Sequence, residues 1–489
     1  MPDLSPRRRY LVLAICCMSL LIVGLETTVL NVALPSLQDD LGSSVSGLQW
    51  ALDAYTLVLA SLLMLSGSTG DRLGRRRTFQ TGLVIFVIAS GLCSIAPDLG
   101  WLIAFRALQG VGGSMLNPVA LSIVTNVFTE RQERARAIGV WGAVVGVSIA
   151  LGPILGGFLV DTVGWRWIFI INIPIGLLAI VLTALFVPES RAARARRVDP
   201  AGQLLVILTL ATLIYSIIEV PHLGWSSPLV IGLLVVSALS ALTLVRYERR
   251  RVEPLLDVRF FRSATFSGAT LIAVCAFAAF AGFLFVNTLY LQHDLGLSPL
   301  RAGVYLLPMA VVVMLLSPVS GRMVGQYGTR PSLIIGGLGM FLGTVTLSLV
   351  DPGRPVALLF VAYTVFGIGF GMINAPITNT AVSGMPPSQA GLAAAVTSTS
   401  RQTGTTVGIA VVGSVYTARL GGGSHLLQAA HAGWWVVAGC AFLALVFGIA
   451  SSGPWARASA ERAARSLAAP GSGPADVSPA VRQGSPAHG

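Results

Sequence analysis

Three charged side chains stand inside long apolar runs of this sequence: Glu26, Asp53 and Arg106. Glu26 lies in "LLIVGLETTVLNVALPSL", whose other residues are apolar enough to cross a lipid bilayer. Estimates of the cost of a charge in a bilayer run from about 3 to over 10 kcal/mol, so ionisable groups in membrane segments usually serve a function. A carboxylate balanced between burial and a nearby arginine can bind a proton from one face and release it to the other. We therefore predict that Glu26, Asp53 and Arg106 couple transport to protons.

Each of these residues also has a structural interpretation. Glu26 could hydrogen-bond a broken helix at "TTVLN", and Asp53 could be shallow enough to reach water near Trp50 and Tyr55. Arg106 could tune the two acids or simply tie helices together through backbone carbonyls, and both interpretations stay open. Either acid could also contact a cationic substrate directly. For the acids we favour the functional interpretation.

The composition indicates which kind of secondary structure positions these groups. The 489 residues are 54% hydrophobic and only 11% charged, with a mean hydropathy of +0.79, whereas a soluble chain carries about 25% charged residues. We expect an all-α membrane protein, in which a spanning helix needs about 20 apolar residues. Fourteen transmembrane helices are predicted, at 10–36, 47–69, 78–96, 100–125, 136–160, 165–187, 201–220, 228–246, 265–292, 300–322, 331–350, 355–380, 390–417 and 431–453.

The distribution of arginine predicts the orientation of these helices. The sequence contains no lysine, and 26 of its 32 basic residues fall in alternate connections or in the two terminal segments. Positively charged connections stay in the cytoplasm, so both termini are predicted to be cytoplasmic. Residues 457–489 are rich in Ala, Pro, Gly and Ser without an apolar period, which favours a disordered cytoplasmic tail.

An internal repeat predicts the domain organisation. The segment "GSTGDRLGRRRT" at 67–78 resembles "GRMVGQYGTRPS" at 321–332, and "QGVGGSMLNP" at 109–118 resembles "FGIGFGMINA" at 366–375. Two similar six-helix halves around a central site are a transporter architecture. We expect an N-terminal six-helix bundle over 1–190, two inserted transmembrane helices over 191–263, a C-terminal six-helix bundle over 264–456 and the tail over 457–489.

Several functional classes are disfavoured. Without lysine the chain cannot form a Walker phosphate loop, so we expect no ATP binding and no cofactor, with the proton gradient as energy source. The basic residues lie in short clusters between apolar runs, which argues against nucleic-acid binding. The five cysteines and five histidines match neither a disulfide framework nor a metal site. No motif of an enzyme is found, so we expect no catalytic activity.

The motifs resemble the major facilitator superfamily, and specifically its fourteen-helix drug:proton antiporter branch, over nearly the whole chain except the tail. "LETTVLNVALP" resembles the first-helix motif of that branch, and "WALDAYTL" resembles a second-helix segment that carries an acid at Asp53. "RALQGVGG" resembles the fourth-helix motif. Two further motifs match through these residues: Gly67, Asp71, Arg72, Gly74 and Arg75 in the loop after the second helix, and Gly152, Pro153, Gly156 and Gly157 in the fifth helix.

The resemblance implies roles for these two motifs. The loop would latch the outward-open state, with Asp71 and Gly74 as its gating residues, although its arginines also keep positive charge inside. Asp71 could cap a helix N-terminus and pair with Arg. The fifth-helix bend at Pro153 would seal the cavity against proton leak and mark antiport, although glycine and proline also occur there for plain packing reasons.

Three departures from the family pattern bear on the substrate. The first-helix acid is Glu26 where Asp is usual, and the second copy of the loop has Gly325 where an Asp would stand. No acid lies well inside the helices of the second half, which weakens a prediction of polycationic substrates. Polar residues at depth could line the cavity or join helices, and we name as candidates Asn31, Gln109, Asn117, Asn374, Asn379, Arg401 and Gln402.

Together these observations predict a proton-coupled antiporter that exports lipophilic small molecules by alternating access across a bacterial cytoplasmic membrane. Antibiotics and dyes are the expected class, with cationic drugs as one option. Export of an endogenous lipid, siderophore or secondary metabolite is the alternative, and uptake by proton symport is less favoured. The expected partners are the lipid bilayer, the small-molecule substrate and protons, and the expected state is a monomer.

Overall fold

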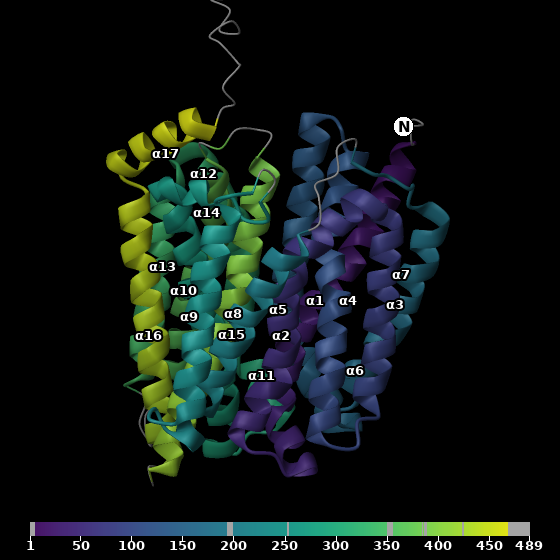
Figure 1. The fold of residues 1–489 in the computed structure, drawn as a ribbon. Coiled ribbons are helices and arrows are strands. Elements are labelled where there is room, and N and C mark those ends of the chain that lie inside the picture. Colours follow the sequence, from purple (N-terminus) through teal and green to yellow (C-terminus); the bar gives the residue numbers. More distant parts are fainter. Residues whose placement is uncertain are drawn as a thin grey trace, which may run out of the picture.

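The protein is helical throughout the residues that its structure, a computed structural model, describes (Figure 1). Those residues are 5–192, 199–251, 254–349, 356–383, 385, 389–422 and 425–467. The first half and the insertion contain α1 (Pro6–Leu41), α2 (Val45–Leu73), α3 (Arg75–Ser94), α4 (Leu99–Val127), α5 (Arg131–Val163), α6 (Trp167–Ile170), α7 (Asn172–Phe186), α8 (Pro200–Leu223) and α9 (Pro228–Glu248). The remainder contains η1 (Val258–Arg262), α10 (Ala264–Leu289), η2 (Tyr290–Asp294), α11 (Pro299–Tyr305), α12 (Leu307–Tyr327), α13 (Thr329–Leu347), α14 (Ala357–Val382), α15 (Ala390–Gly421), α16 (Leu426–Ser451) and α17 (Pro454–Leu467).

The expected membrane spans coincide with these helices. In the described part of the chain, 13 helices are long and apolar enough to cross a membrane. The segment expected at 390–417 forms α15, which is 32 residues long but is not among those 13. The span at 165–187 is divided into α6 and α7, and the span at 300–322 into α11 and α12. The total of fourteen spans therefore stays a prediction.

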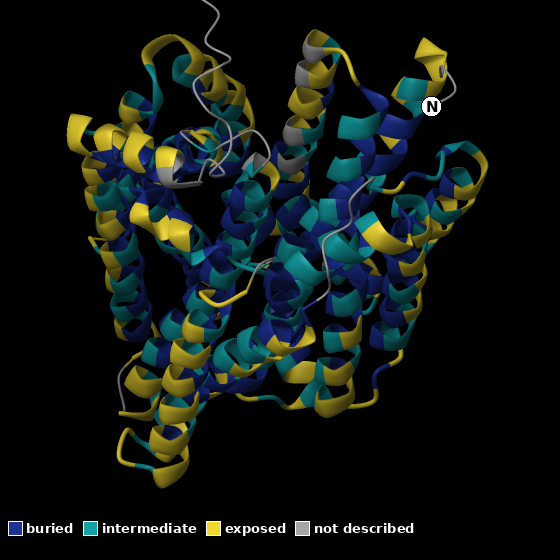
Figure 2. Cartoon of the chain, turned by 45° about the horizontal axis from the view of Figure 1, so that its top comes forward, coloured by how far each residue is buried: buried dark blue, intermediate teal, exposed yellow. Residues whose placement is uncertain are grey.

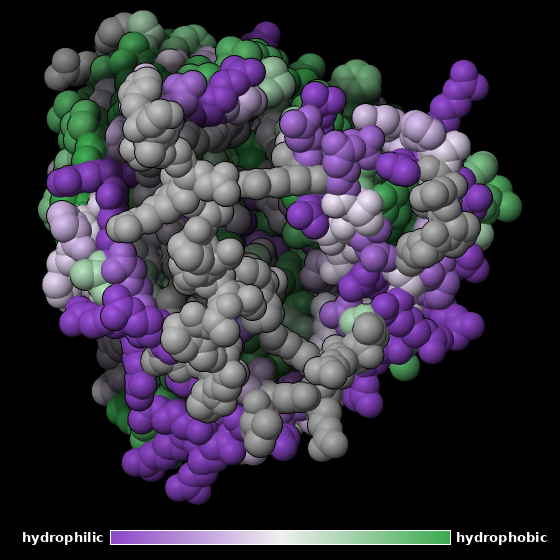
Figure 3. Space-filling model, turned by 90° about the horizontal axis from the view of Figure 1, so that it is seen from above, coloured by the Kyte–Doolittle hydropathy of each residue, from purple (hydrophilic) through white to green (hydrophobic). Residues whose placement is uncertain are grey.

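Both ends of the described chain lie at the same face of the helix bundle, where α1 begins and α17 packs (Figure 1). Hydrophilic side chains gather over this face in a view from above (Figure 3). Large apolar side chains are instead exposed along the outer helices, such as Leu178 and Val181 on α7 and Leu239 on α9. Figure 2 shows such exposed residues on the outward helix surfaces. An apolar belt of this kind suits contact with lipid, while the assignment of the hydrophilic face to the cytoplasm stays a prediction.

The prediction of a disordered tail from residue 457 is wrong for its first eleven residues, because α17 extends to Leu467. Ala456, Ala460 and Ala463 are buried on one side of α17, while Arg457 and Arg462 are exposed on the other. The apolar side was missed because it consists of alanines, which add little to hydropathy. The rest of the predicted tail, 468–489, lies outside the described residues.

The internal repeat corresponds to repeated geometry. Gly74 joins α2 to α3 with φ +116°, and Gly328 joins α12 to α13 with φ +80°. Both values lie in the left-handed region that favours glycine. A Cβ atom at Gly112 would lie 2.8 Å from the carbonyl oxygen of Gly82, and one at Gly369 would lie 2.6 Å from that of Gly336. The aligned glycines therefore bring α4 against α3, and α14 against α13, in the same way.

Helices α8 and α9 form a hairpin that contacts both halves. Gln203 of α8 donates to the carbonyl of Ser61 in α2 over 2.5 Å. Ser414 of α15 donates to the carbonyl of Ile217 in α8 over 2.5 Å. Each residue of these pairs is buried or half-buried. The inserted hairpin is thus hydrogen-bonded to α2 on one side and to α15 on the other.

Candidate functional site

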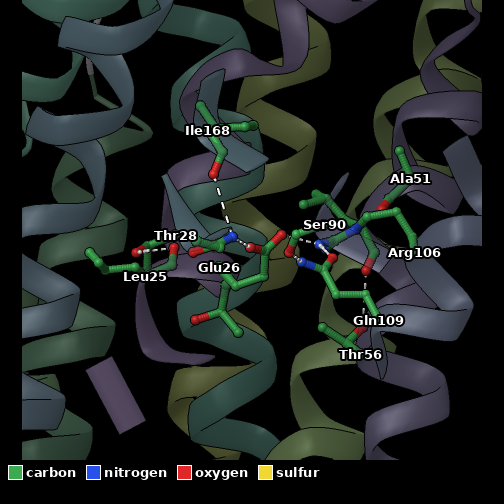
Figure 4. A network of polar contacts seen from close by, with 12 residues as sticks. Leu25, Glu26, Thr28, Ala51, Thr56, Ser90, Arg106, Gln109 and Ile168 are labelled. Atoms are coloured by element: carbon green, nitrogen blue, oxygen red, sulfur yellow. Dashed lines mark hydrogen bonds and ion pairs between the residues drawn. The ribbon is translucent and has the colours of Figure 1, made fainter. Parts of the chain in front are cut away.

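Glu26 and Arg106 form an ion pair inside the first half (Figure 4). Arg106 Nη1 donates to Glu26 Oε1, and the two side chains are 1% and 3% exposed. Glu26 lies near the middle of α1 and Arg106 lies in α4. A buried charge is tolerated when a partner and hydrogen bonds replace its hydration. The structure thus brings together two of the three groups that sequence predicts for proton coupling.

Further hydrogen bonds surround this pair. Asn172 Nδ2 donates to Glu26 Oε2 over 2.7 Å. Arg106 Nη1 donates to Gln109 Oε1 over 2.7 Å, and Arg106 Nε donates to the carbonyl of Ala51 over 3.0 Å. Gln109 Nε2 in turn donates to Ser90 Oγ over 2.8 Å, so the network extends into α3. Five helices, α1, α2, α3, α4 and α7, contribute to it (Figure 4).

Aromatic rings cover the guanidinium of Arg106. Its Cζ atom lies 4.6 Å from the ring centre of Tyr55 and 5.9 Å from that of Phe169. A cation over an aromatic face is stabilised, and more so where water is excluded. Arg106 therefore keeps favourable partners even when Glu26 is neutral, and both charge states of Glu26 can be accommodated.

Asp53 is separate from the ion pair. Its side chain is fully buried and its Oδ1 accepts from Thr56 Oγ1 over 3.2 Å, while its Oδ2 has no hydrogen-bond partner in the part of the chain that the structure describes. Of the ion pairs found in the described residues, none includes Asp53. A shallow position that reaches water is not what this conformation shows. An orphaned carboxylate oxygen in an apolar interior favours the neutral acid or a partner supplied by substrate.

The loop after α2 is held by contacts within the first half. Arg75 donates to Asp71 Oδ1 through Nη2 at 2.8 Å and through Nε at 3.1 Å. The backbone N–H of Arg75 donates to the carbonyl of Ser190 over 2.9 Å, and Ala192 N–H donates to the carbonyl of Asp71 over 3.1 Å. Arg72 is exposed. The predicted pairing of Asp71 with an arginine is therefore present.

Asp71 does not cap the following helix, because it lies in the last turn of α2. Glu189 takes that role instead: its Oε1 accepts from the backbone N–H of Arg76 in the first turn of α3 over 3.1 Å. A Cβ atom at Gly74 would lie 2.6 Å from this same oxygen. A Cβ atom at Gly67 would make only an ordinary van der Waals contact with Pro118. Only Gly74, of the two motif glycines, is thus required by its surroundings.

The fifth-helix motif lies where helices approach most closely. A Cβ at Gly152 would lie 1.9 Å from Thr28 Oγ1, and one at Gly156 would lie 2.9 Å from the carbonyl oxygen of Val29. These two glycines therefore bring α5 against α1, beside Glu26. Gly157 faces the other half, where its Cβ would lie 2.5 Å from the carbonyl oxygen of Pro299.

Pro153 completes this close contact between the halves. Its carbonyl oxygen lies 2.2 Å from where a Cβ of Gly303 would stand, so α5 and α11 touch backbone to backbone. Asp161 Oδ2 accepts from Ser298 Oγ over 2.8 Å and from Leu300 N–H over 3.1 Å at the start of α11. Such contacts hold the two halves together at the face opposite the N-terminus (Figure 1).

Two glutamine side chains also join the halves toward that same face. Gln49 Nε2 donates to the carbonyls of Ile409 over 3.3 Å and Ala410 over 2.9 Å. Gln292 Nε2, in the π-helical turn η2, donates to the carbonyl of Val32 over 2.8 Å. The described structure is therefore closed at the face away from the chain termini.

The polar residues predicted for the cavity do not form one cluster. Gln109 is fully buried in the Arg106 network rather than on a cavity wall. Arg401 donates to Thr378 Oγ1 over 2.5 Å and to the carbonyl of Asn374 over 3.3 Å, and its Cζ lies 5.7 Å from the ring centre of Phe277. This contact joins α15 to α14 and α10. The others are placed as follows: Asn31 is buried, Asn117 and Gln402 are half-buried, and Asn379 is exposed.

Sequence reasoning missed three members of the site: Asn172, Ser90 and Tyr55. Asn172 stands in "INIP" within an apolar run, and the same signal that singled out the other buried amides was present there. Ser90 and Tyr55 gave no comparable signal, because small hydroxyl residues and tyrosines are common in membrane helices.

Comparisons with known proteins agree with this architecture. The profile of the Major Facilitator Superfamily matches residues 16–409. Among solved structures, the D-xylose-proton symporter superposes with a TM-score of 0.64 at 18% identity, covering 90% of this chain and 97% of the symporter. A POT family transporter superposes with a TM-score of 0.67 at 15% identity, covering 89% and 94%. At these identities the likeness shows a common fold.

Several drug and antibiotic resistance proteins are more similar in sequence than these solved structures. The multidrug resistance protein Stp of Mycobacterium tuberculosis is 36% identical over 414 residues, which are 85% of this chain and 77% of that protein. The puromycin resistance protein pur8 of Streptomyces alboniger is 37% identical, with 85% and 83% covered. The tetracenomycin C resistance and export protein of Streptomyces glaucescens is 33% identical, with 82% and 74% covered.

Proposed function

The chain belongs to the Major Facilitator Superfamily, and we propose that it is a proton-coupled antiporter that exports lipophilic small molecules such as antibiotics and dyes. The observation that carries the proposal is the match, over most of the chain, to multidrug and antibiotic resistance proteins. The chain is a multi-pass protein of the cell membrane.

Glu26 is the group that we propose carries the proton. It is buried, it is paired to Arg106, and each of its oxygens has a donor. When Glu26 is charged, Arg106 neutralises it. When Glu26 is protonated, Arg106 still has the Ala51 carbonyl, Gln109 and the ring of Tyr55. A carboxyl group with two supported charge states is suited to reversible proton binding.

Coupling requires that the proton site responds to the opening of the transporter. Gly152 and Gly156 place α5 against α1 within two and three residues of Glu26 in sequence, at Thr28 and Val29. Gly157 places the same helix against α11 of the other half. Movement of α5 relative to α11 therefore reaches the surroundings of Glu26 through one rigid helix. We propose this route as the link between alternating access and protonation.

The loop residues Asp71, Arg72, Gly74 and Arg75 are proposed to act at the opposite face. The hydrogen bonds of this loop to Ser190, Ala192 and Glu189 lie within the first half. A loop held in this way is proposed to engage the second half when that face closes. The energy source is the proton gradient, with no ATP and no cofactor, and the transporter is proposed to act as a monomer.

Export of a secondary metabolite remains the second candidate, because one relative is named for resistance to and export of tetracenomycin C. The same machinery serves both candidates, and only the substrate differs. The cavity candidates Asn31, Asn117, Asn374, Asn379, Arg401 and Gln402 stay proposals for the substrate site.

The deciding experiment uses inverted membrane vesicles that are acidified inside. A fluorescent pH probe is followed while antibiotics, dyes and quaternary amines are added in turn. A substrate of an antiporter should dequench the probe, and Glu26→Gln should abolish this signal at equal expression. Glu219→Gln is the matched control, since Glu219 accepts from Trp50 Nε1 over 3.2 Å away from the Arg106 network. A normal signal in Glu26→Gln would refute Glu26 as the proton carrier, and silence across the panel would favour a metabolite.

A further inference from the structure

Two carboxyl groups meet at the end of the inserted hairpin, on the face predicted to be cytoplasmic. Asp199 precedes α8 and Glu248 ends α9, and the two residues are 3% and 2% exposed. Among the described residues, Asp199 Oδ2 and Glu248 Oε1 each have no hydrogen-bond partner. This site is distinct from the Glu26 network and carries none of the motifs identified in the sequence.

The two orphaned oxygens face the same point. A Cβ atom on Gly202 would lie 2.6 Å from Glu248 Oε1 and 2.9 Å from Asp199 Oδ2. Glycine leaves room for both oxygens there. Two buried anionic oxygens beside the same glycine repel one another, and neighbouring buried carboxyl groups can share a single proton.

The other oxygens show which residue keeps its negative charge. Asp199 Oδ1 accepts from Gly202 N–H over 3.0 Å, from Tyr247 Oη over 2.9 Å and from Arg251 Nη2 over 3.2 Å. Burial acts to raise the pKa of Asp199, but these hydrogen bonds and the Arg251 charge lower it below its ordinary value. Glu248 Oε2 accepts from Leu256 N–H over 3.4 Å.

We propose that Asp199 and Glu248 share one proton, which Glu248 Oε1 carries and donates to Asp199 Oδ2. This single proton gives both orphaned oxygens a partner. Because Glu248 also binds Leu256, the proton holds together the start of α8, the end of α9 and the segment that leads to α10. The charged and titratable groups that face the pair among the described residues are Tyr247 and Arg251. The site is a pH-sensitive lock between the inserted hairpin and the second half.

The test is thermal unfolding of the full-length protein in detergent, monitored by tryptophan fluorescence. The Tm is measured from about pH 6 to about pH 9, because buried glutamates can release their protons as high as about pH 8 to 9. The wild-type Tm should fall as pH rises, because loss of the proton leaves two buried negative charges. Glu248→Gln should remove this fall, since its amide N–H donates to Asp199 at every pH. Asp199→Asn, which removes one charge, is the second variant and should also flatten the profile.

Glu133→Gln is the matched control, because Glu133 pairs with Arg9 on the same face and is one-third exposed. It should keep the wild-type profile. Infrared spectroscopy at neutral pH should show a protonated-carboxyl band component that Glu248→Gln lacks. An unchanged fall of Tm in both Asp199→Asn and Glu248→Gln, or no loss of the band, would overturn the proposal. Restoration of the wild-type Tm at high pH by added sodium or potassium would overturn it as well, in favour of a bound metal cation.

Discussion

Asn172 donates a 2.7 Å hydrogen bond to Glu26 Oε2, the carboxylate oxygen that Arg106 does not bind. The two residues are 146 positions apart, at the start of α7 and in the middle of α1. A hydrogen bond to a charged group contributes about 1.5 to 3 kcal/mol. Asn172 therefore favours the charged form of Glu26 and is a positioning residue of the proposed proton site.

Replacing Asn172 with Leu should displace the pH profile of transport toward alkaline pH, because the charged form of Glu26 loses a donor. The measurement is probe dequenching in inverted vesicles over a series of internal and external pH values. Thr209→Val is the control, since the hydroxyl of Thr209 donates to the carbonyl of Leu205 in its own helix, α8. An Asn172→Leu profile that coincides with the wild type would refute the role of this bond.

Arg106→Lys should reduce pH-driven transport at least about 10-fold despite keeping the charge. Arg106 uses Nε toward Ala51 and Nη1 toward Glu26 and Gln109, and an ammonium cannot reproduce this forked geometry. Expression and Tm are measured alongside transport to separate loss of coupling from loss of folding. Wild-type transport in Arg106→Lys would mean that only the charge matters.

Gly74→Ala should lower the free energy of unfolding by about 1 to 3 kcal/mol, because its φ of +116° is strained for alanine. The added methyl would also meet Glu189 Oε1 at 2.6 Å. The double variant Gly74→Ala with Glu189→Ala should recover the part of the lost unfolding free energy that comes from the contact between the new methyl and Glu189. Gly232→Ala in α9, where nothing lies within 4 Å, is the control and should not destabilise. Equal Tm values in Gly74→Ala and the wild type would contradict the expectation.

Sequence and structure agree most where the signal is local. The length of apolar runs marks the helices, and lone charges in those runs mark Glu26 and Arg106, since both features are visible within one segment. The partners Asn172, in α7, and Glu189, in the segment after α7, come from elsewhere in the chain and depend on packing, which no single segment encodes. The helix α17 was missed because its buried side consists of small residues. Shared glycine geometry at Gly74 and Gly328 shows that the repeat was the most informative long-range signal.

Asp71→Asn should slow turnover more than it weakens substrate binding. The Asp71 and Arg75 pair is partly exposed, and such pairs contribute only about 0 to 1 kcal/mol to stability. Its loss should therefore leave Tm and substrate Kd nearly unchanged while the rate of pH-driven transport falls. A parallel loss of affinity and rate would show that the loop acts on the substrate site rather than on the conformational change.

Gly157→Ala should prevent full closure of the face away from the termini. The new methyl would stand 2.5 Å from the Pro299 carbonyl oxygen and 2.7 Å from Leu300 Cα, and backbone atoms cannot move aside as a side chain can. The halves should separate there, so spin labels on the last turn of α5 and on α11 should report a longer mean distance. Transport should fall because the closed conformation is lost. In Gly139→Ala, in the same helix, the new methyl would have no atom within 4 Å. This variant should keep the wild-type distance and rate. If Gly157→Ala also kept them, the contact between α5 and α11 would have no part in gating.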